Sequence, residues 1–448
     1  MASVRAAAVA GMFYPGDARV LASELEELFG GVEQSDVRLG YPKALIVPHA
    51  GYIYSGPVAA RAYDELGPAR GIVRRVVMLG PVHRVPVRGL AMPTDAAFAT
   101  PLGSVPIDHE ALARVHGLPQ VVKSDVPHMQ EHALEVQLPF LQRQLGEFAL
   151  APFAVGDASV AQVAEVLERL WGGPETLIVL STDLSHYHPY AEARQIDCNT
   201  VTRIAGLATD LDHEEACGAT PLNGLLAVAQ QRNLSIRLLA ACNSGDTAGG
   251  KGRVVGYSAF ALHEPGTDVS LDEAGSRLLG IARGAIESKL FGSAAAADAP
   301  WLRQNGATFI TLTRDGQLRG CIGSLQAARP LGEDVAGNAI AAAFRDPRFA
   351  PVSSAEWPSV RVEVSLLSTP KPLRFADEQD LLAQLRPGED GVILEADGRR
   401  ATFLPQVWEN IPDKRAFLRE LARKAGLADD VRLSRCRISR YKVTKWKE

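Results

Sequence analysis

Short apolar runs alternate with helical patterns through the first part of the chain. The runs have the length and composition of buried strands, and they predict strands at residues 44–47, 75–79, 148–155, 176–180, 236–240 and 254–262. The intervals between them repeat apolar residues at helical spacing and predict helices that include residues 17–29, 134–145, 160–171 and 191–207. This pattern favours an α/β fold with a mainly parallel sheet and helices on both faces.

The later part of the chain has a different order of elements. Helices are predicted over residues 271–290 and 331–344, and strands over residues 307–313 and 360–367. This order is typical of a smaller α+β domain.

The boundary between the two parts is marked by local turn and capping signals. Pro265-Gly266 ends an apolar run, and Ser270-Leu-Asp-Glu has the spacing of a capping box that begins a helix. We therefore expect two domains, at residues 1–264 and 265–448.

Composition narrows the classes of function. The chain has 47 basic and 52 acidic residues, a net charge of −5, which argues against a surface adapted to a polyanion. Nucleic acid is therefore not an expected partner. All ten histidines lie at or before His263, so we expect imidazole chemistry to belong to the first domain.

The cysteines and apolar runs indicate the compartment. The five cysteines are scattered without a CxxC pair, which fits neither a disulfide framework nor a zinc-finger spacing. No signal peptide and no membrane-spanning run are recognisable. We therefore expect a cytoplasmic protein that does not enter a membrane.

Residues able to bind a metal or move a proton follow four of the predicted strands. His49, His83 and Cys242 each come at or just after a strand end, and Asp183 is followed by His186 after another. Ligands of open α/β sheets bind outside the carboxyl ends of the strands, so these side chains can converge. Two imidazoles and a thiolate can hold Fe(II), Cu or Zn, and the spacing does not choose among these ions.

A second candidate segment contains His132 and Glu135. Their i, i+3 spacing places them on one face of a predicted helix start, where they can orient a ligand or relay a proton. The alternative is a capped helix terminus with a solvated glutamate, and the sequence favours neither. Cys217 and Cys198 lack a second ligand at useful spacing and are interpreted as packing residues.

Cys321 is the candidate for chemistry in the second domain. It stands in Arg319-Gly-Cys-Ile-Gly, where a nearby guanidinium would favour the thiolate. Cys321 can then act as a nucleophile, with Glu363 as an acid or base. A small buried cysteine in a glycine-rich turn is the alternative, because this domain has no histidine to serve as the base.

The motifs VPHAGYIYSG, LGPVH, EHALEVQLPF, STDLSHY and CNSGDT resemble the Memo family over about residues 5–263. The fold of that family is similar to the catalytic subunit of class III extradiol ring-cleaving dioxygenases. The resemblance implies that His49, His83 and Cys242 are metal ligands with Asp183 and His186 beside them. It also implies iron or copper redox chemistry, with His186 as a general acid or base toward a small-molecule or peptide substrate.

The motifs LRGCIGS, AFRDPRFAPVS, EVSLLS and ATFLPQVW resemble the AMMECR domain over about residues 270–447. A chain with both domains is similar to a fusion of two components of the AmmeMemoRadiSam system. The resemblance implies a separate radical-SAM partner, because no CxxxCxxC occurs in this chain.

Two other functions stay open at the same strand-end pocket. Memo-like proteins have also been regarded as phosphotyrosine-peptide binders, so the pocket can instead belong to a non-catalytic peptide or phospho-ligand binding module. A zinc-dependent hydrolase is the second alternative, since two histidines and a cysteine also suit zinc.

Overall fold

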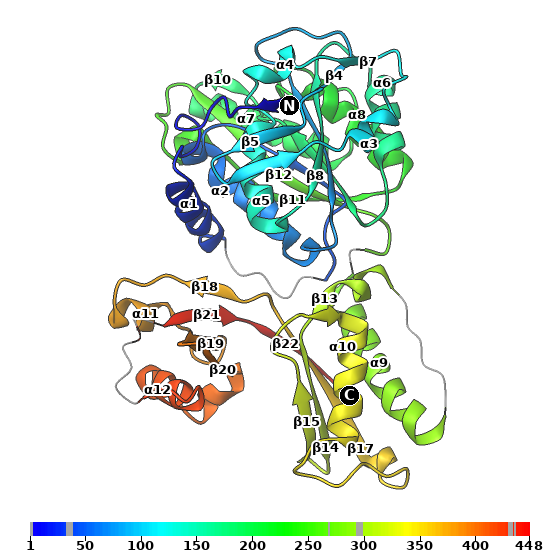
Figure 1. Cartoon of the computed structure of the whole chain (residues 1–448), viewed down its shortest axis with the longest axis vertical. Helices are drawn as coiled ribbons and strands as arrows, with labels where there is room; N and C mark the ends of the chain where they lie inside the picture. The colour runs from blue at the N-terminus through cyan, green and yellow to red at the C-terminus, as the bar shows by residue number, and fades with distance from the viewer. Residues whose placement is uncertain (1–2, 33–38, 268, 293–298, 429–432, 434–435) are drawn as a thin grey trace. The chain divides into compact units, whose positions relative to one another are not determined.

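The structure of the protein is a computed structural model that describes residues 3–32, 39–267, 269–292, 299–428, 433 and 436–448. The chain divides into two compact units (Figure 1). The first unit contains Met1–Val32 and Tyr41–Asp268, and the second contains Glu33–Gly40 and Val269–Glu448.

The first unit is built on one large mixed sheet. Its strands are β2 (Ala44–Val47), β3 (Arg75–Pro81), β4 (Leu90–Met92), β7 (Val121–Lys123), β8 (Ala149–Val155), β9 (Thr176–Ser181), β10 (His186–His188), β11 (Ser235–Asn243) and β12 (Val254–His263). A separate small sheet contains β1 (Val4–Arg5), β5 (Ala97–Thr100) and β6 (Gly103–Pro106).

The centre of the large sheet is parallel. Strand β9 pairs in parallel with both β2 and β3, and β3 pairs in parallel with β8. Every residue of β2 and β9 is buried, as expected for strands covered on both faces. The carboxyl ends of β2, β9, β3 and β8 therefore lie at one edge of the sheet, where the loops that follow them can meet.

Helices complete the first unit. They are α1 (Ala18–Gly30), α2 (Tyr52–Tyr63), α3 (His109–Ala113), α4 (Val126–Met129), α5 (Leu138–Leu145), α6 (Val160–Leu170), α7 (Tyr190–Ala205) and α8 (Ala219–Gln231), with 3-10 turns η1 (Asp64–Ala69), η2 (Glu135–Gln137) and η3 (Ser244–Asp246). Helices α1, α2 and α5 pack together, and α6 packs against α8 (Figure 1). The predicted α/β fold with helices on both faces is confirmed.

The second unit has antiparallel sheets and few helices. Its strands are β13 (Asn305–Gly306), β14 (Thr308–Arg314), β15 (Gln317–Gly323), β16 (Arg329–Pro330), β17 (Val360–Leu367), β18 (Lys371–Leu373), β19 (Gly391–Ala396), β20 (Arg399–Phe403), β21 (Arg437–Tyr441) and β22 (Val443–Lys447). Its helices are α9 (Leu271–Phe291), α10 (Leu331–Phe344), α11 (Glu378–Gln384) and α12 (Lys414–Lys424), with turns η4 (Pro300–Arg303), η5 (Trp357–Ser359) and η6 (Pro405–Glu409).

Two four-stranded sheets organise the second unit, in the orders β15-β14-β17-β22 and β18-β21-β19-β20. Alternate residues of β14 are buried. Two of them, Ile310 and Leu312, lie in one core with Leu278 of α9 and Val335 of α10. Helix α9 begins at Ser270, whose side chain accepts a hydrogen bond from the Glu273 backbone N–H. The α+β prediction for this part is confirmed. Among the described residues, no helix is both long enough and apolar enough to cross a membrane.

Candidate metal centre

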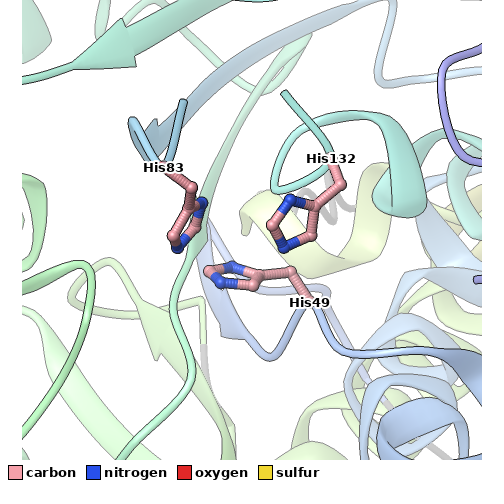
Figure 2. Close-up of side chains that lie close together, drawn as sticks. All are labelled: His49, His83 and His132. Atoms are coloured by element: carbon pink, nitrogen blue, oxygen red, sulfur yellow. The ribbon is translucent and has the colours of Figure 1, made fainter. Parts of the chain in front are cut away.

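Three histidines from different segments meet at the carboxyl edge of the large sheet. His49 follows β2, His83 follows β3, and His132 lies in the loop between α4 and η2. One ring nitrogen from each lies within 4.8 Å of the others, and Figure 2 shows the three rings facing a common space. Because β2 and β3 both run parallel to β9, His49 and His83 reach the same edge, as the sequence predicted.

A buried glutamate orients two of the rings. The Glu131 carboxylate accepts hydrogen bonds from His83 Nδ1 at 2.8 Å and from the His83 backbone N–H at 2.7 Å. His132 Nδ1 lies 3.3 Å from the same carboxylate. Burial alone would raise the pKa of Glu131, but the hydrogen bond and charge of His83 and two backbone donors lower it to about 2. An ionised acceptor at Nδ1 of His83 leaves Nε2 of that ring free to bind a metal.

The third ring is oriented by a hydroxyl group. Ser181 Oγ donates to the Ala133 carbonyl at 2.7 Å, so it accepts from His49 Nδ1 at 2.8 Å and from Gln137 Nε2 at 3.0 Å. His49 therefore carries its proton on Nδ1 and presents the Nε2 lone pair. His49 and His83 thus have the hydrogen-bonded support that metal-binding imidazoles have in proteins, and the three-histidine donor set fits a divalent ion.

Burial favours the neutral form of two of the imidazoles, His49 and His132. Desolvation, together with the charge of His83, lowers the pKa of His49 well below its usual value. Desolvation and the charge of His49 lower the pKa of His132 to about 4. Neutral rings bind a cation at neutral pH without first losing a proton.

A thiol and a carboxylate stand beside His49. Cys217 Sγ lies 3.4 Å from His49 Nε2 and 3.3 Å from the Asp183 backbone N. Asp183 Oδ1 accepts from the His49 backbone N–H at 2.7 Å, and Oδ2 lies 3.9 Å from Nε2. Burial and the Asp183 charge raise the pKa of Cys217 to about 12. Cys217 is interpreted from the sequence as a packing residue. In the structure its sulfur contacts the His49 ring and so lies next to the candidate centre.

Among the described residues, the group that could hold a metal ion consists of His49, His83 and His132, and Cys242 is not part of it. It pairs with Tyr257 near the end of β11, and β12 separates β11 from β2. The strand order β11-β12-β2-β9-β3 puts four intervals of about 4.8 Å between the strand that carries Cys242 and the strand that His83 follows. Cys242 as a metal ligand stays a prediction that this geometry does not support.

The other predicted residues of the first unit have distinct surroundings. His186 lies on β10 with Nδ1 2.8 Å from the Leu184 carbonyl. Glu135 does not pair with His132. Its buried carboxylate accepts from Arg5 Nη1 and Tyr14 OH, both at 2.7 Å, and from two backbone N–H groups, so it anchors the N-terminal segment.

Sequence reasoning missed Glu131 and Cys217. Glu131 directly precedes His132, but its i, i+1 position suggested no shared face, and the loop that turns it toward His83 is a tertiary feature. Cys217 directly precedes the N-cap of α8, a position that the strand-end argument did not include.

Cys321 in the second unit lies on β15, the edge strand of its sheet. Thr311 Oγ1 donates to its sulfur at 3.5 Å, and Asp346 accepts its backbone N–H at 2.9 Å. The two groups predicted to assist it are engaged elsewhere. Arg319 pairs with Glu356 at 2.9 Å, and Glu363 pairs with Lys447 at 2.9 Å.

Comparison with known proteins adds the family. A family model described as Memo-like protein matches residues 5–261. The chain belongs to the Memo-like family. The Memo-like domain is fused to a domain that matches the AMMECR1 family over residues 279–446.

Relatives of the Memo-like domain come from archaea and bacteria. The chain is 36% identical over 288 residues to the MEMO1 family protein MK0963 of Methanopyrus kandleri, which covers 58% of this chain and 98% of that protein. It is 35% identical over 269 residues to a MEMO1 family protein of Aquifex aeolicus, covering 57% and 97%.

A solved structure is similar to part of the chain. The uncharacterized protein PH0010 from Pyrococcus horikoshii is 34% identical with a TM-score of 0.36, covering 39% of this chain and 91% of that one.

Proposed function

We propose that the Memo-like domain is a metal-dependent redox protein that holds iron or copper through Nε2 of His49, His83 and His132. The observation that carries this proposal is that one nitrogen of each ring lies within 4.8 Å of the others, while Ser181 and Glu131 hold the His49 and His83 rings at Nδ1. Three imidazole ligands suit Fe(II), Cu and Zn and leave coordination positions open.

The side chains around the three rings have separate tasks in this proposal. Glu131 and Ser181 fix the tautomers, and Asp183 holds the His49 backbone. His186 donates Nδ1–H to the Leu184 carbonyl, which leaves Nε2 to accept a proton from a bound substrate. A bound iron or copper ion would supply one-electron chemistry and an open position for substrate or oxygen.

A zinc-dependent hydrolase is the second candidate. Three histidines with an open fourth position form a donor set that also suits catalytic zinc. Oxygen consumption that follows iron or copper occupancy favours the redox protein, whereas activity kept with zinc and lost with iron or copper favours the hydrolase. Tight peptide binding by metal-free protein would favour a binding module instead.

The ligand set is tested by metal analysis of protein purified without oxygen. We expect His132→Ala to lower bound iron or copper from about one per chain to less than about one tenth. Cys242→Ala and the exposed control Cys198→Ala are expected to retain it. If His132→Ala keeps its bound metal and Cys242→Ala loses it, the result would favour the ligand set predicted from the sequence, His49, His83 and Cys242, and contradict the three-histidine set.

We further propose that the AMMECR domain binds or modifies a substrate and that a separate radical-SAM protein works with this chain. The fusion of the two domains supports this proposal. Co-purification of the full chain with its candidate radical-SAM partner, at equal stoichiometry after gel filtration, is the expected outcome. Separate elution of the two proteins at micromolar concentration would contradict it.

A further inference from the structure

A strained tyrosine stands beside the candidate metal centre. Tyr187, between His186 and His188 of β10, has φ of 64°, and 61% of it is exposed. A bulky side chain rarely adopts this left-handed conformation, and the pairing of β10 with β12 is irregular at the same point. Strain of this kind gathers at ligand sites, where the surrounding structure enforces it.

An arginine packs on this tyrosine. The Arg253 guanidinium carbon lies 4.9 Å from the centre of the Tyr187 ring. Among the described residues, Arg253 forms no ion pair with a carboxylate. Stacking on an aromatic face restrains the guanidinium while leaving its N–H groups free to bind an anion with two parallel hydrogen bonds.

The pair of Tyr187 and Arg253 is connected to the metal centre through His186. The Tyr187 and His186 ring centres are 5.6 Å apart. His186 lies three residues after Asp183, whose Oδ1 accepts a hydrogen bond from the His49 backbone N–H at 2.7 Å. An anion bound by Arg253 would therefore lie beside the group proposed to exchange a proton with the substrate.

Neighbouring cations lie close to this strand. Lys251 Nζ lies 4.6 Å above the Tyr190 ring, and the Arg194 guanidinium carbon lies 5.9 Å from the same ring. Two acidic groups nearby already have partners: Asp246 accepts from Tyr190 OH at 2.5 Å, and Glu192 accepts from His188 Nδ1 at 3.0 Å. These cations can therefore add to the attraction of an anion.

We propose that Arg253, held against Tyr187, binds the anionic group of a small substrate, a carboxylate or a phosphate, while the rest of the substrate reaches the metal centre. This inference rests on the proposed function of that centre and adds the class of its substrate. Arg253 has the task of positioning and selecting the substrate.

The test compares two probes that differ only in a carboxylate, catechol and 3,4-dihydroxybenzoate, by calorimetric titration of iron-loaded protein without oxygen. We expect Arg253→Gln to weaken binding of 3,4-dihydroxybenzoate about tenfold or more and to leave catechol binding within about twofold. Arg253→Lys, which keeps the charge but not the planar fork, is expected to lie between. Arg114→Gln is the control for the loss of one positive charge. Arg114 is exposed at the C-terminal end of α3 and pairs with Glu110.

Equal affinity of Arg253→Gln and the wild type for 3,4-dihydroxybenzoate would overturn the inference, as would failure of that probe to bind the wild type at millimolar concentration. Once the tenfold loss is found, competition with inorganic phosphate identifies the group: displacement indicates phosphate, and its absence indicates carboxylate. The titration is repeated on metal-free protein. Two results together would contradict the proposed metal function but not the anion site. They are probe binding that still depends on Arg253 in metal-free protein and a chain that takes up no metal.

Discussion

At the scale of single residues, the candidate centre depends on groups that never touch the metal. Glu131 accepts hydrogen bonds from His83 and from the backbone of His132 and Ala133, so one carboxylate fixes the His83 ring and the loop that carries His132. Such partners set the basicity and direction of metal-binding imidazoles. Changing them alters metal affinity without removing a ligand.

Glu131→Gln tests this role. The amide keeps the size of the side chain but loses the charge, and we expect metal affinity to fall about 10- to 100-fold. Competition with a chelator of known affinity measures the change. Glu165→Gln, on the exposed surface of α6, is the matched control and should not change the affinity. An unchanged affinity in Glu131→Gln would show that the carboxylate does not support the ligands.

His128 gives a pH-dependent prediction at the same scale. Burial lowers the pKa of His128 to about 4 from a usual value of 6.5, while Nε2 bonds the Ala91 carbonyl at 3.0 Å. Between pH 6.5 and 4 the unfolded chain binds more protons than the folded chain, so stability falls as pH falls through this window and levels off below it. The contribution is on the order of 3 kcal/mol.

Urea unfolding of metal-free protein at several pH values measures this effect. His128→Gln keeps a donor for the Ala91 carbonyl but does not titrate, so its stability should depend less on pH between 6.5 and 4. Parallel curves for the wild type and His128→Gln would contradict the assignment.

At the scale of elements, close packing between α6 and α8 holds one side of the sheet. A Cβ atom added at Gly224 of α8 would lie 2.3 Å from Val163 Cγ1 of α6. The two helices therefore approach closely only because residue 224 has no side chain.

Gly224→Ala is expected to destabilise the first unit by about 1–3 kcal/mol, because the extra methyl group overpacks this contact. Adding Val163→Ala should recover part of the loss, which a double-mutant cycle in urea measures. Gly280→Ala on α9, where nothing lies within 4 Å of the added Cβ, is the control and should stabilise or leave stability unchanged. An unchanged free energy of unfolding in Gly224→Ala would contradict the packing argument.

At the scale of the whole molecule, the chain passes between its two units more than once. Leu39, from the segment Glu33–Gly40, is buried in the core of the second unit with Leu302 and Trp357, and the Gly40 N–H donates to Gln304 Oε1 at 2.9 Å. The metal centre, by contrast, is made entirely by the first unit. The two units therefore have separate cores and separate sources of stability.

We expect metal to stabilise only the first unit. At a free metal concentration 1,000 times the dissociation constant, the gain is about 4 kcal/mol. Hydrogen exchange followed by mass spectrometry should show slower exchange in segments around β2, β3 and β9 and unchanged exchange in β14 and β17. Equal protection of both units would contradict this separation.

The sequence by itself determined the elements and the class of each domain. Strand β2 and helix α10 have the predicted bounds, because uninterrupted apolar runs and clear helical periodicity leave little freedom. It also placed His49 and His83 at strand ends, because the carboxyl ends of parallel strands meet at one edge.

The tertiary structure decided which other groups join these two. Strand order carries β11 and Cys242 away from β3, although Cys242 also stands near a strand end. The loop before η2 brings His132 and Glu131 to the rings, and the turn before α8 brings Cys217 to His49. A pattern along the chain records which residues precede or follow an element, whereas the order of strands and the path of loops arise only when the whole sheet packs.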